Sequence, residues 1–334
     1  MATSVVRNLP SHADLTTVAE EVRRLVSWAG FSDAVRDRVL LRLGANDRVL
    51  SNDLAAPTSY LTLAAFQSAA GTGDPARAVP AAASMEFLMA CGDLLDDVQD
   101  DEGPAIFDNA SAAPVMEDVC VLLLLAHRAL QELTIRGVDD RTVAEVYRLL
   151  DESSIQAMRG QQVDADLESR DNVTLTQCLE TTAAKSASLT QCAAEMGATI
   201  ARVAPDTVEL YGKLGWHLGM AAQLTNDIAG VWPWGPATSD VRLHKKTLPV
   251  VATLTKPHET DDDVALVTRF FSSERLRRSG DASLEAEVRW AVWRSGGVRL
   301  AWMAASLQRL AAAGAIKELS RRVPSAAALE RLIA

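Results

Sequence analysis

The sequence has little cysteine, few aromatic residues and no long apolar run. Its four cysteines include no CxxC pair, which excludes a disulfide scaffold, and we expect buried free thiols in a reducing cytoplasm. The longest stretch without a charge, Leu54 to Gly73, contains Pro57, Gly71 and several polar side chains, so it predicts an interior helix rather than a membrane span. The segment Met1 to Pro10 lacks the apolar run of a secretory signal. These absences predict a cytoplasmic protein.

Basic residues are outnumbered by acidic ones. Lysine and arginine total 33, aspartate and glutamate total 44, and the formal net charge of the 334-residue chain is −11. Such a surface is a poor match for a phosphate backbone, which rewards clusters of lysine and arginine. We therefore expect no nucleic-acid partner.

Alternating strand patterns of useful length are absent, and apolar residues recur at helical spacing along the chain, as at Val143, Val146, Leu149 and Leu150. Glycine and proline separate the helical segments. We predict helices near residues 14–29, 32–43, 57–70, 77–101, 114–136, 140–166, 174–198, 206–230, 245–256, 261–272, 282–295, 297–314 and 323–333. The expected fold is all-α, a single domain over residues 1–334 that forms a large helical bundle around a deep central cavity, with residues 1–12 as a flexible tail.

An acidic cluster ends one of the longest predicted helices. Six of the ten residues from Asp93 to Glu102 are acidic and none is basic. On a helix, Asp93, Asp96, Asp97 and Asp100 share one face, where neighbouring carboxylates lie about 5–6 Å apart and repel. The macrodipole also disfavours anions at a helix C-terminus. The cluster is either a solvated helix end or a divalent-cation site, and the apolar residues before it favour Mg²⁺ held by oxygen ligands.

A second polar cluster ends a later helix. Gln223, Asn226 and Asp227 share a helical face and offer oxygen atoms to a metal or a phosphate. Lys245 and Lys246 follow a short loop and carry positive charge that could reach the same place. Taken alone, this pattern also fits a solvated helix end.

Two further features admit both a structural and a functional interpretation. Lys185 is the single lysine of a long helix of small residues, where it is either paired or directed toward a ligand. Trp290 and Trp293 are neighbours on one helix face. Indole faces stabilise cations, so a cavity lined by them would suit carbocation chemistry, and core packing is the alternative.

The order of these motifs resembles the trans-isoprenyl diphosphate synthase (polyprenyl synthetase) family. The resemblance rests on Glu86, the acidic motif Asp96-Asp97-x-x-Asp100, GQxxD at Gly160–Asp164, Lys185, QxxND at Gln223–Asp227 and KKTLP at Lys245–Pro249. It runs from about residue 55 to residue 256. Each motif alone is weak, and their order, spacing and helical setting carry the assignment.

The resemblance implies the isoprenoid synthase type I fold, usually as a homodimer, and an enzyme that ionises an allylic prenyl diphosphate of C10–C20 with three Mg²⁺ ions. The implied catalytic and metal-binding residues are Asp96, Asp97 and Asp100 on one helix and Asn226 and Asp227 on another. The resemblance also implies that the diphosphate is bound by Lys185, Gln223, Lys245 and Lys246. The implied residues of the cavity wall are Met89, Gly92, Gln161 and Asp164. The cavity would exclude water, because water would quench the carbocation.

The sequence departs from the family where a second diphosphate, that of isopentenyl diphosphate, would bind. The family has basic residues in an early helix and just after the first aspartate motif. Here the stretch from Asp53 to Tyr60 keeps Pro57 but contains no base, and neither does Asp101 to Asn109. A diphosphate without arginine or lysine partners would be poorly held. The family's last aspartate of the second motif is replaced by Gly230.

The missing bases lead us to expect a terpene synthase of the isoprenyl-diphosphate-synthase type, which rearranges or cyclises the carbocation. The same absence also fits a prenyltransferase with an acceptor other than isopentenyl diphosphate. A third possibility is a chain-elongating polyprenyl diphosphate synthase whose second site uses bases from elsewhere in the chain. A non-enzymatic regulatory subunit is disfavoured by the intact first aspartate motif, because such a subunit needs no metal ligands.

Overall fold

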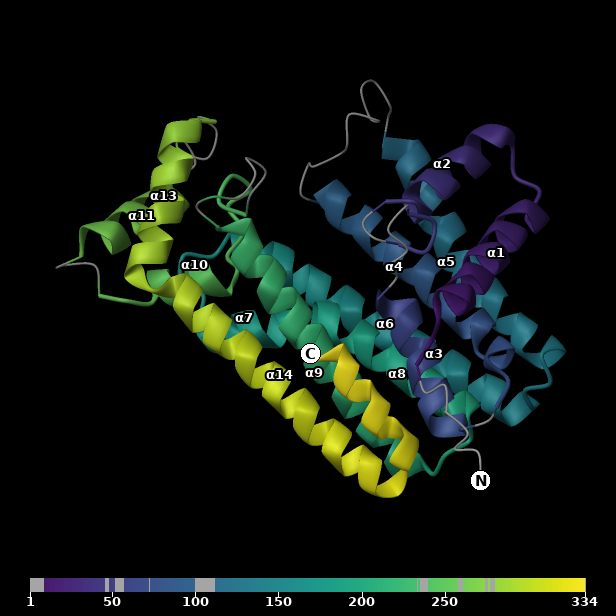
Figure 1. Ribbon diagram of the computed structural model, residues 1–334. Coiled ribbons are helices and arrows are strands. Elements are labelled where there is room, and N and C mark those ends of the chain that lie inside the picture. The colour runs from purple at the N-terminus through teal and green to yellow at the C-terminus, as the bar shows by residue number, and fades with distance from the viewer. Residues whose placement is uncertain are drawn as a thin grey trace. The chain divides into compact units, whose positions relative to one another are not determined.

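The computed structural model describes residues 9–45, 48–51, 57–71, 73–99, 112–232, 234, 240–257, 261–273, 276 and 280–333. Every regular element within these ranges is a helix, which confirms the all-α prediction (Figure 1). The chain divides into two compact units. Unit 1 comprises residues 1–154, 189–215 and 312–334, and unit 2 comprises residues 155–188 and 216–311. The single domain over residues 1–334 stays a prediction, as does the deep central cavity.

Unit 1 is built around the helix that carries the first acidic cluster. Its elements are α1 (His12–Trp28), α2 (Asp33–Leu43), α3 (Pro57–Ala70), η1 (Pro75–Arg77), α4 (Val79–Gln99), α5 (Ala112–Ile135), most of α8 (Ser188–Ile200) and η4 (Pro324–Leu332). Helix α4 packs along α5, α3 and α1. Its first half is buried and, apart from Ser84 and Glu86, apolar, whereas its last two turns are acidic and half-buried. The apolar half therefore fixes α4 in the core and leaves the carboxylates at its end.

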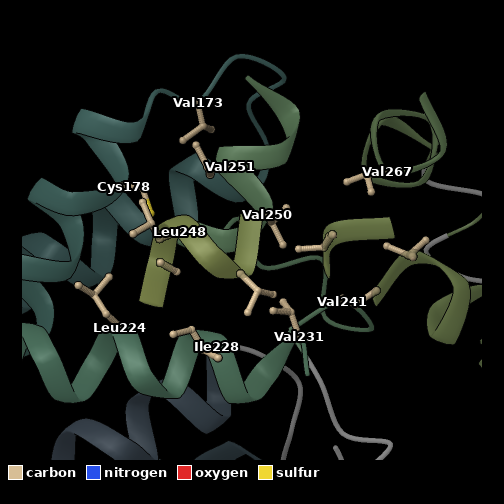
Figure 2. Packing of buried hydrophobic residues seen from close by; sticks show 14 of the residues in the cluster. Val173, Cys178, Leu224, Ile228, Val231, Val241, Leu248, Val250, Val251 and Val267 are labelled. Carbon is tan, nitrogen blue, oxygen red and sulfur yellow. The ribbon is translucent and has the colours of Figure 1, made fainter. Parts of the chain in front are cut away.

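Unit 2 contains α7 (Leu175–Thr182), η3 (Ala183–Ala187), α10 (Leu248–Leu254), α11 (Asp262–Ser272) and α13 (Ala282–Ser295). The longest helices, α6 (Asp140–Glu168), α9 (Pro205–Gly230) and α14 (Gly297–Arg322), contribute residues to both units. Figure 2 shows the core of unit 2, where Leu248 of α10 lies on the side of Leu224 and Ile228 of α9, and Val251 of α10 lies beside Val173. This contact between apolar side chains holds the KKTLP segment on α9.

Four predicted helices differ from the structure. The helix predicted over residues 297–314 continues to Arg322. The helix predicted over residues 174–198 is divided into α7, a π-helical turn (η3) and α8. The helix predicted over 245–256 begins only at Leu248, because Thr247 has extended backbone and Pro249 occupies the first turn, where proline is favoured. Residues Pro324–Leu332 form a 3-10 helix rather than an α-helix.

The described helices include none that combines the length and the apolar character needed to cross a bilayer. Three cysteines, Cys91, Cys178 and Cys192, are buried as predicted, and their thiols are held by the helical core. The prediction was wrong for Cys120, which is exposed on α5. Helical periodicity placed it in an apolar segment, but it lies on the outer face of that helix.

Candidate active site

The end of α4 carries the carboxylates that the first aspartate motif predicted. Asp93, Asp96 and Asp97 lie on its last two turns and are half-buried. Asp100, the fourth carboxylate on this predicted face, lies outside the described residues. The described residues contain no group of three or more His, Cys, Asp or Glu side chains arranged to hold a metal ion. Asp96 and Asp97 supply hard oxygen donors of the kind Mg²⁺ prefers, so the donor chemistry at this helix end fits that ion.

Two arginines lie beside these carboxylates, and sequence reasoning missed both. The guanidinium of Arg48 donates a hydrogen bond to Asp93, and Arg48 is only 7% exposed. Arg42 Nη1 lies 3.9 Å from Asp97 Oδ2. These arginines come from the end of α2 and the turn after it, outside residues 53–60 and 101–109, where the family has its bases. Positive charge is therefore present at the acidic end of α4.

Glu86 holds the turn that carries Arg48. Its buried carboxylate accepts hydrogen bonds from the Val49 N–H, at 3.1 Å, and from the Ser59 hydroxyl. Burial is the largest influence on this group and raises the pKa of Glu86. The carboxylate thus joins α4, α3 and the Arg48 turn at one point. This arrangement gives a structural reason for a glutamate ten residues before Asp96.

Two of the predicted cavity residues lie on α4 one and two turns before the carboxylates. Met89 and Gly92 are both half-buried. A Cβ atom added at Gly92 would meet no other atom within 4 Å, so there is open space beside this position. This open space next to the acidic turns agrees with the prediction that Gly92 lines the wall of a cavity. The cavity itself stays a prediction.

In unit 2, the structure brings several predicted site residues together. Lys185 Nζ donates to Asp164 Oδ2 at 2.9 Å. The helices that carry them approach closely, because a Cβ atom at Gly160 would lie 2.4 Å from the backbone nitrogen of Lys185. Lys185 also lies in the π-helical turn η3, and such turns occur often at functional sites. Gln161, the other cavity residue predicted on α6, is buried.

Asp227 on α9 is buried in the same cluster. It accepts a hydrogen bond from Gln223 Nε2 at 3.0 Å, and Gln223 Oε1 accepts one from Ser186 at 2.9 Å. Burial raises the pKa of Asp227 to about 6, against the opposing influence of the Gln223 hydrogen bond and of the Leu248 N–H. Asp227 therefore also anchors the start of α10. Its neighbour Asn226 is exposed, and its role as a metal ligand stays a prediction, as does that of Asp227.

The two lysines of the KKTLP segment differ in their surroundings. Lys246 Nζ donates to the Arg170 carbonyl, and burial lowers the pKa of Lys246. Lys245 is half-buried, and its backbone N–H donates to the Asp240 carbonyl at 2.8 Å. The structure thus directs Lys246 toward the loop between α6 and α7. Its assignment to a diphosphate stays a prediction, as does that of Lys245.

The space beside Gly230 is filled by another acidic side chain. A Cβ atom at Gly230 would lie 2.3 Å from the carboxylate carbon of Asp240. The Asp240 N–H also donates to the Gly230 carbonyl at 3.1 Å, which holds the two residues together. An aspartate at position 230 would therefore require the Asp240 side chain to move. The end of α9 keeps a carboxylate nearby, and no local sequence signal pointed to it.

The tryptophans of unit 2 pack against one another. Trp293 lies 4.9 Å from Trp232 between ring centroids, and Trp290 lies 4.8 Å from Trp234, both edge to face. Such pairs stabilise a fold by about 0.5–1.5 kcal/mol beyond the area they bury. The packing interpretation therefore accounts for Trp290 and Trp293.

Comparison with known proteins agrees with these motifs. The chain is 33% identical to a (2E,6E)-farnesyl diphosphate synthase of Mycobacterium bovis over 200 residues, which are 57% of this chain and 54% of that protein. It is 32% identical to a geranylgeranyl diphosphate synthase of Mycobacterium tuberculosis over 207 residues, which are 59% of this chain and 58% of that protein. The chain thus spans little more than half the length of these curated relatives.

Solved structures show the same fold over nearly the whole chain. A geranylgeranyl pyrophosphate synthase matches 97% of this chain and 99% of its own, with a TM-score of 0.81 and 22% identity. A polyprenyl synthetase from Streptomyces coelicolor matches 99% of both chains, with a TM-score of 0.80 and 23% identity. The family model described as polyprenyl synthetase matches residues 58–274, more than half of the chain. The chain therefore belongs to the polyprenyl synthetase family.

Proposed function

We propose that this protein is a chain-elongating trans-prenyl diphosphate synthase, which joins isopentenyl diphosphate to an allylic diphosphate. The proposal is supported by the family match and by relatives named farnesyl and geranylgeranyl diphosphate synthase. The observation that carries it is the presence of Arg48 and Arg42 beside the α4 carboxylates. These arginines provide basic side chains for a second diphosphate. The absence of such bases from the family's usual positions is what had favoured a terpene synthase. The comparisons favour this alternative over the terpene-synthase expectation.

The residues of this chain have distinct roles in the proposed reaction. Asp96 and Asp97 would hold Mg²⁺, together with Asp100, and the bound metal neutralises the diphosphate leaving group. Lys185 is held by Asp164 so that its ammonium charge is available to a diphosphate oxygen without a large loss of side-chain entropy. The turn that carries Arg48 is held against α4 by the hydrogen bond from the neighbouring Val49 N–H to Glu86. Each of these groups binds or orients anionic oxygen atoms, which is the main task in this chemistry.

The second candidate function is cyclisation of the allylic cation without isopentenyl diphosphate. The observation in its favour is the lack of any lysine or arginine in residues 53–60 and 101–109. If Arg48 serves only to neutralise Asp93, the second diphosphate would have no partner there. The two functions differ in whether the product contains an added five-carbon unit.

One assay separates them. The purified protein is incubated with Mg²⁺ and geranyl, farnesyl or geranylgeranyl diphosphate, with and without isopentenyl diphosphate. A longer prenyl diphosphate that forms only with isopentenyl diphosphate supports the proposal. A hydrocarbon or alcohol formed without it supports cyclisation instead. Asp96→Asn should abolish both reactions and weaken Mn²⁺ binding measured by calorimetry, with the exposed Asp37→Asn as the matched control.

We also propose that the protein is a homodimer that pairs through α5. One face of this helix exposes apolar side chains at helical spacing, namely Met116, Cys120, Leu123 and Leu124. Leu124 is 66% exposed, and with its neighbours it forms a contiguous apolar patch of the kind that marks interaction sites. Light scattering should show a dimer that Leu124→Glu converts to a monomer, whereas Leu41→Glu, at an exposed leucine of α2, leaves the mass unchanged. A wild-type monomer would contradict this assignment.

A further inference from the structure

The C-terminal helix η4 packs on α3, the helix whose start lacks basic residues. The Ser325 hydroxyl donates to the Ser68 carbonyl at 2.6 Å, which joins the first turn of η4 to the last turn of α3. Ala326 and Leu329 are fully buried and hold η4 in the core of unit 1. Because Ser68 lies so near the end of α3, the rest of η4 can pack along α3 only by running back toward Pro57.

The lengths of the two helices bring Arg331 beside Tyr60. A 3-10 helix rises about 2.0 Å per residue, so η4 advances about 12 Å from Ser325 to Arg331. An α-helix rises about 1.5 Å per residue, so α3 covers about 12 Å from Ser68 back to Tyr60. The charge of Arg331 accordingly acts on the Tyr60 hydroxyl: burial raises the pKa of Tyr60, and the guanidinium opposes this rise. The two side chains therefore lie together at the first turn of α3.

The charge of Arg331 is available to an anion. Its side chain is exposed, and no carboxylate of the described residues forms an ion pair with it. Arg322, at the end of α14 in the same unit, is different, because its Nη1 lies 2.6 Å from Asp206 Oδ2. Arg331 thus brings an uncompensated positive charge to a helix start that has none of its own.

The turn that carries Arg48 meets the same part of α3 from another direction. The Ser59 hydroxyl donates to Glu86, and this carboxylate also holds the Arg48 turn. Consecutive residues of an α-helix point about 100° apart, so the contacts at Ser59 and Tyr60 lie on different sides of α3. Arginines from two remote parts of the chain, Arg48 and Arg331, therefore reach the first turn of this helix.

We propose that Arg331 and Tyr60 bind the diphosphate of isopentenyl diphosphate at the start of α3. This inference rests on the proposed function and names a base in place of those that residues 53–60 and 101–109 lack. A guanidinium presents paired N–H donors that match two phosphate oxygens, and a tyrosine hydroxyl donates one further hydrogen bond. Because the base comes from η4, the second diphosphate site is complete only when this C-terminal helix is docked on α3.

Steady-state kinetics of the full-length protein test the assignment. Arg331→Gln should raise the KM for isopentenyl diphosphate about tenfold and leave the KM for the allylic substrate unchanged, because charge-assisted hydrogen bonds are lost at one site only. Arg331→Lys keeps the charge and should recover part of the affinity. Tyr60→Phe should raise the same KM about threefold. Arg321→Gln, at an exposed arginine near the end of α14, is the matched control and should behave as the wild type does.

Calorimetry gives a second readout that does not depend on turnover. Isopentenyl diphosphate is titrated into each protein without Mg²⁺, so that metal-dependent binding at the aspartate motifs does not contribute. The wild type and Arg321→Gln should bind it about tenfold more tightly than Arg331→Gln does. Circular dichroism shows whether each variant is folded. Ser325, Ala326 and Leu329 hold η4 without help from residue 331, so we expect Arg331→Gln to keep the wild-type spectrum.

The outcomes separate this inference from the proposed function. If the wild type elongates the allylic substrate and Arg331→Gln has an unchanged KM and affinity, the inference is wrong and the proposed function stands. Equal increases in the KM of both substrates would also overturn it, because Arg331 would then act through the fold. If the wild type does not elongate but binds isopentenyl diphosphate in a manner that depends on Arg331, the proposed function is wrong and the anion site stands. A wild type that neither elongates nor binds rejects both.

Discussion

Lys185 Nζ lies 2.9 Å from Asp164 Oδ2, and this ion pair joins two motifs that are 21 residues apart. The pair depends on the close approach of α6 to the π-helical turn at Gly160. The Lys185 side chain is half-buried, and the Asp164 carboxylate holds its ammonium group. The alternatives left open for Lys185, a paired lysine or a ligand-binding lysine, are thus compatible, because the pairing fixes the charge in place.

Replacing Lys185 should impair the reaction more than it impairs folding. Under the proposed function, Lys185→Gln removes a charge that would bind the diphosphate, so we expect kcat/KM for the allylic substrate to fall about a hundredfold. Asp164→Asn should have a smaller effect, because the ammonium group remains. Steady-state kinetics of both variants measure this, with the exposed Lys213→Gln of α9 as control. Equal activity of Lys185→Gln and Lys213→Gln would remove Lys185 from the site.

Replacing Arg48 should affect isopentenyl diphosphate rather than the allylic substrate. A hydrogen bond to a charged group is worth about 1.5–3 kcal/mol, so Arg48→Gln should raise the KM for isopentenyl diphosphate about tenfold or more. Arg48→Lys should restore part of the affinity, because it keeps the charge but not the fork geometry. The exposed Arg23→Gln of α1 is the matched control. An unchanged KM in Arg48→Gln would favour the cyclisation reading.

Glu86 should make stability depend on pH. Burial raises its native pKa above the value in the unfolded chain, so between these two values the native state binds more protons. The contribution of Glu86 to the free energy of unfolding is therefore complete at low pH and is lost as pH rises through the native pKa. Glu86→Gln cannot ionise, so its stability does not fall in this way as pH rises. The Ser59 hydroxyl can still donate to the Ala82 carbonyl, 3.0 Å away, in the variant.

Denaturant titrations of the wild type and Glu86→Gln over a pH series measure the difference in stability. The free energy of unfolding of Glu86→Gln should increase relative to that of the wild type as pH rises. This difference should level off above the native pKa of Glu86. A difference that is constant at all pH values would show that Glu86 keeps its ordinary pKa. Because Glu86 anchors the Arg48 turn, its variants should also raise the KM for isopentenyl diphosphate, in the same direction as Arg48→Gln.

Substitution by alanine should have opposite effects on the stability of the protein at two helical glycines. Gly160→Ala places a methyl group against the backbone at Lys185, which should destabilise the protein by about 1–3 kcal/mol. Gly92→Ala meets no atom within 4 Å and improves helix propensity, so it should stabilise by up to about 1 kcal/mol. Chemical denaturation of both variants gives the two values. Similar stability of the two variants would contradict the close approach of α6 to η3.

Much of the candidate site could be predicted from the sequence because its groups are set by helical periodicity. Asp96 and Asp97 lie together at the end of α4, and Gln223 and Asp227 lie on one face of α9, as the spacing of three and four residues predicts. The lengths of several helices could also be predicted, since proline and glycine mark their ends. The break at η3 could not, because a π-helical turn leaves no distinct residue pattern.

What the sequence alone determined was the helical class, the order of the motifs and the family they indicate, since each depends on residues near one another in the chain. Only the tertiary structure decided which partners those residues meet. Arg48 reaches Asp93 across 45 residues, and the carboxylate of Asp240 fills the space beside Gly230. The tertiary structure also decided that Cys120 faces outward and that leucines line the outer face of α14. Such contacts follow from the path of the chain between helices, which local spacing does not encode.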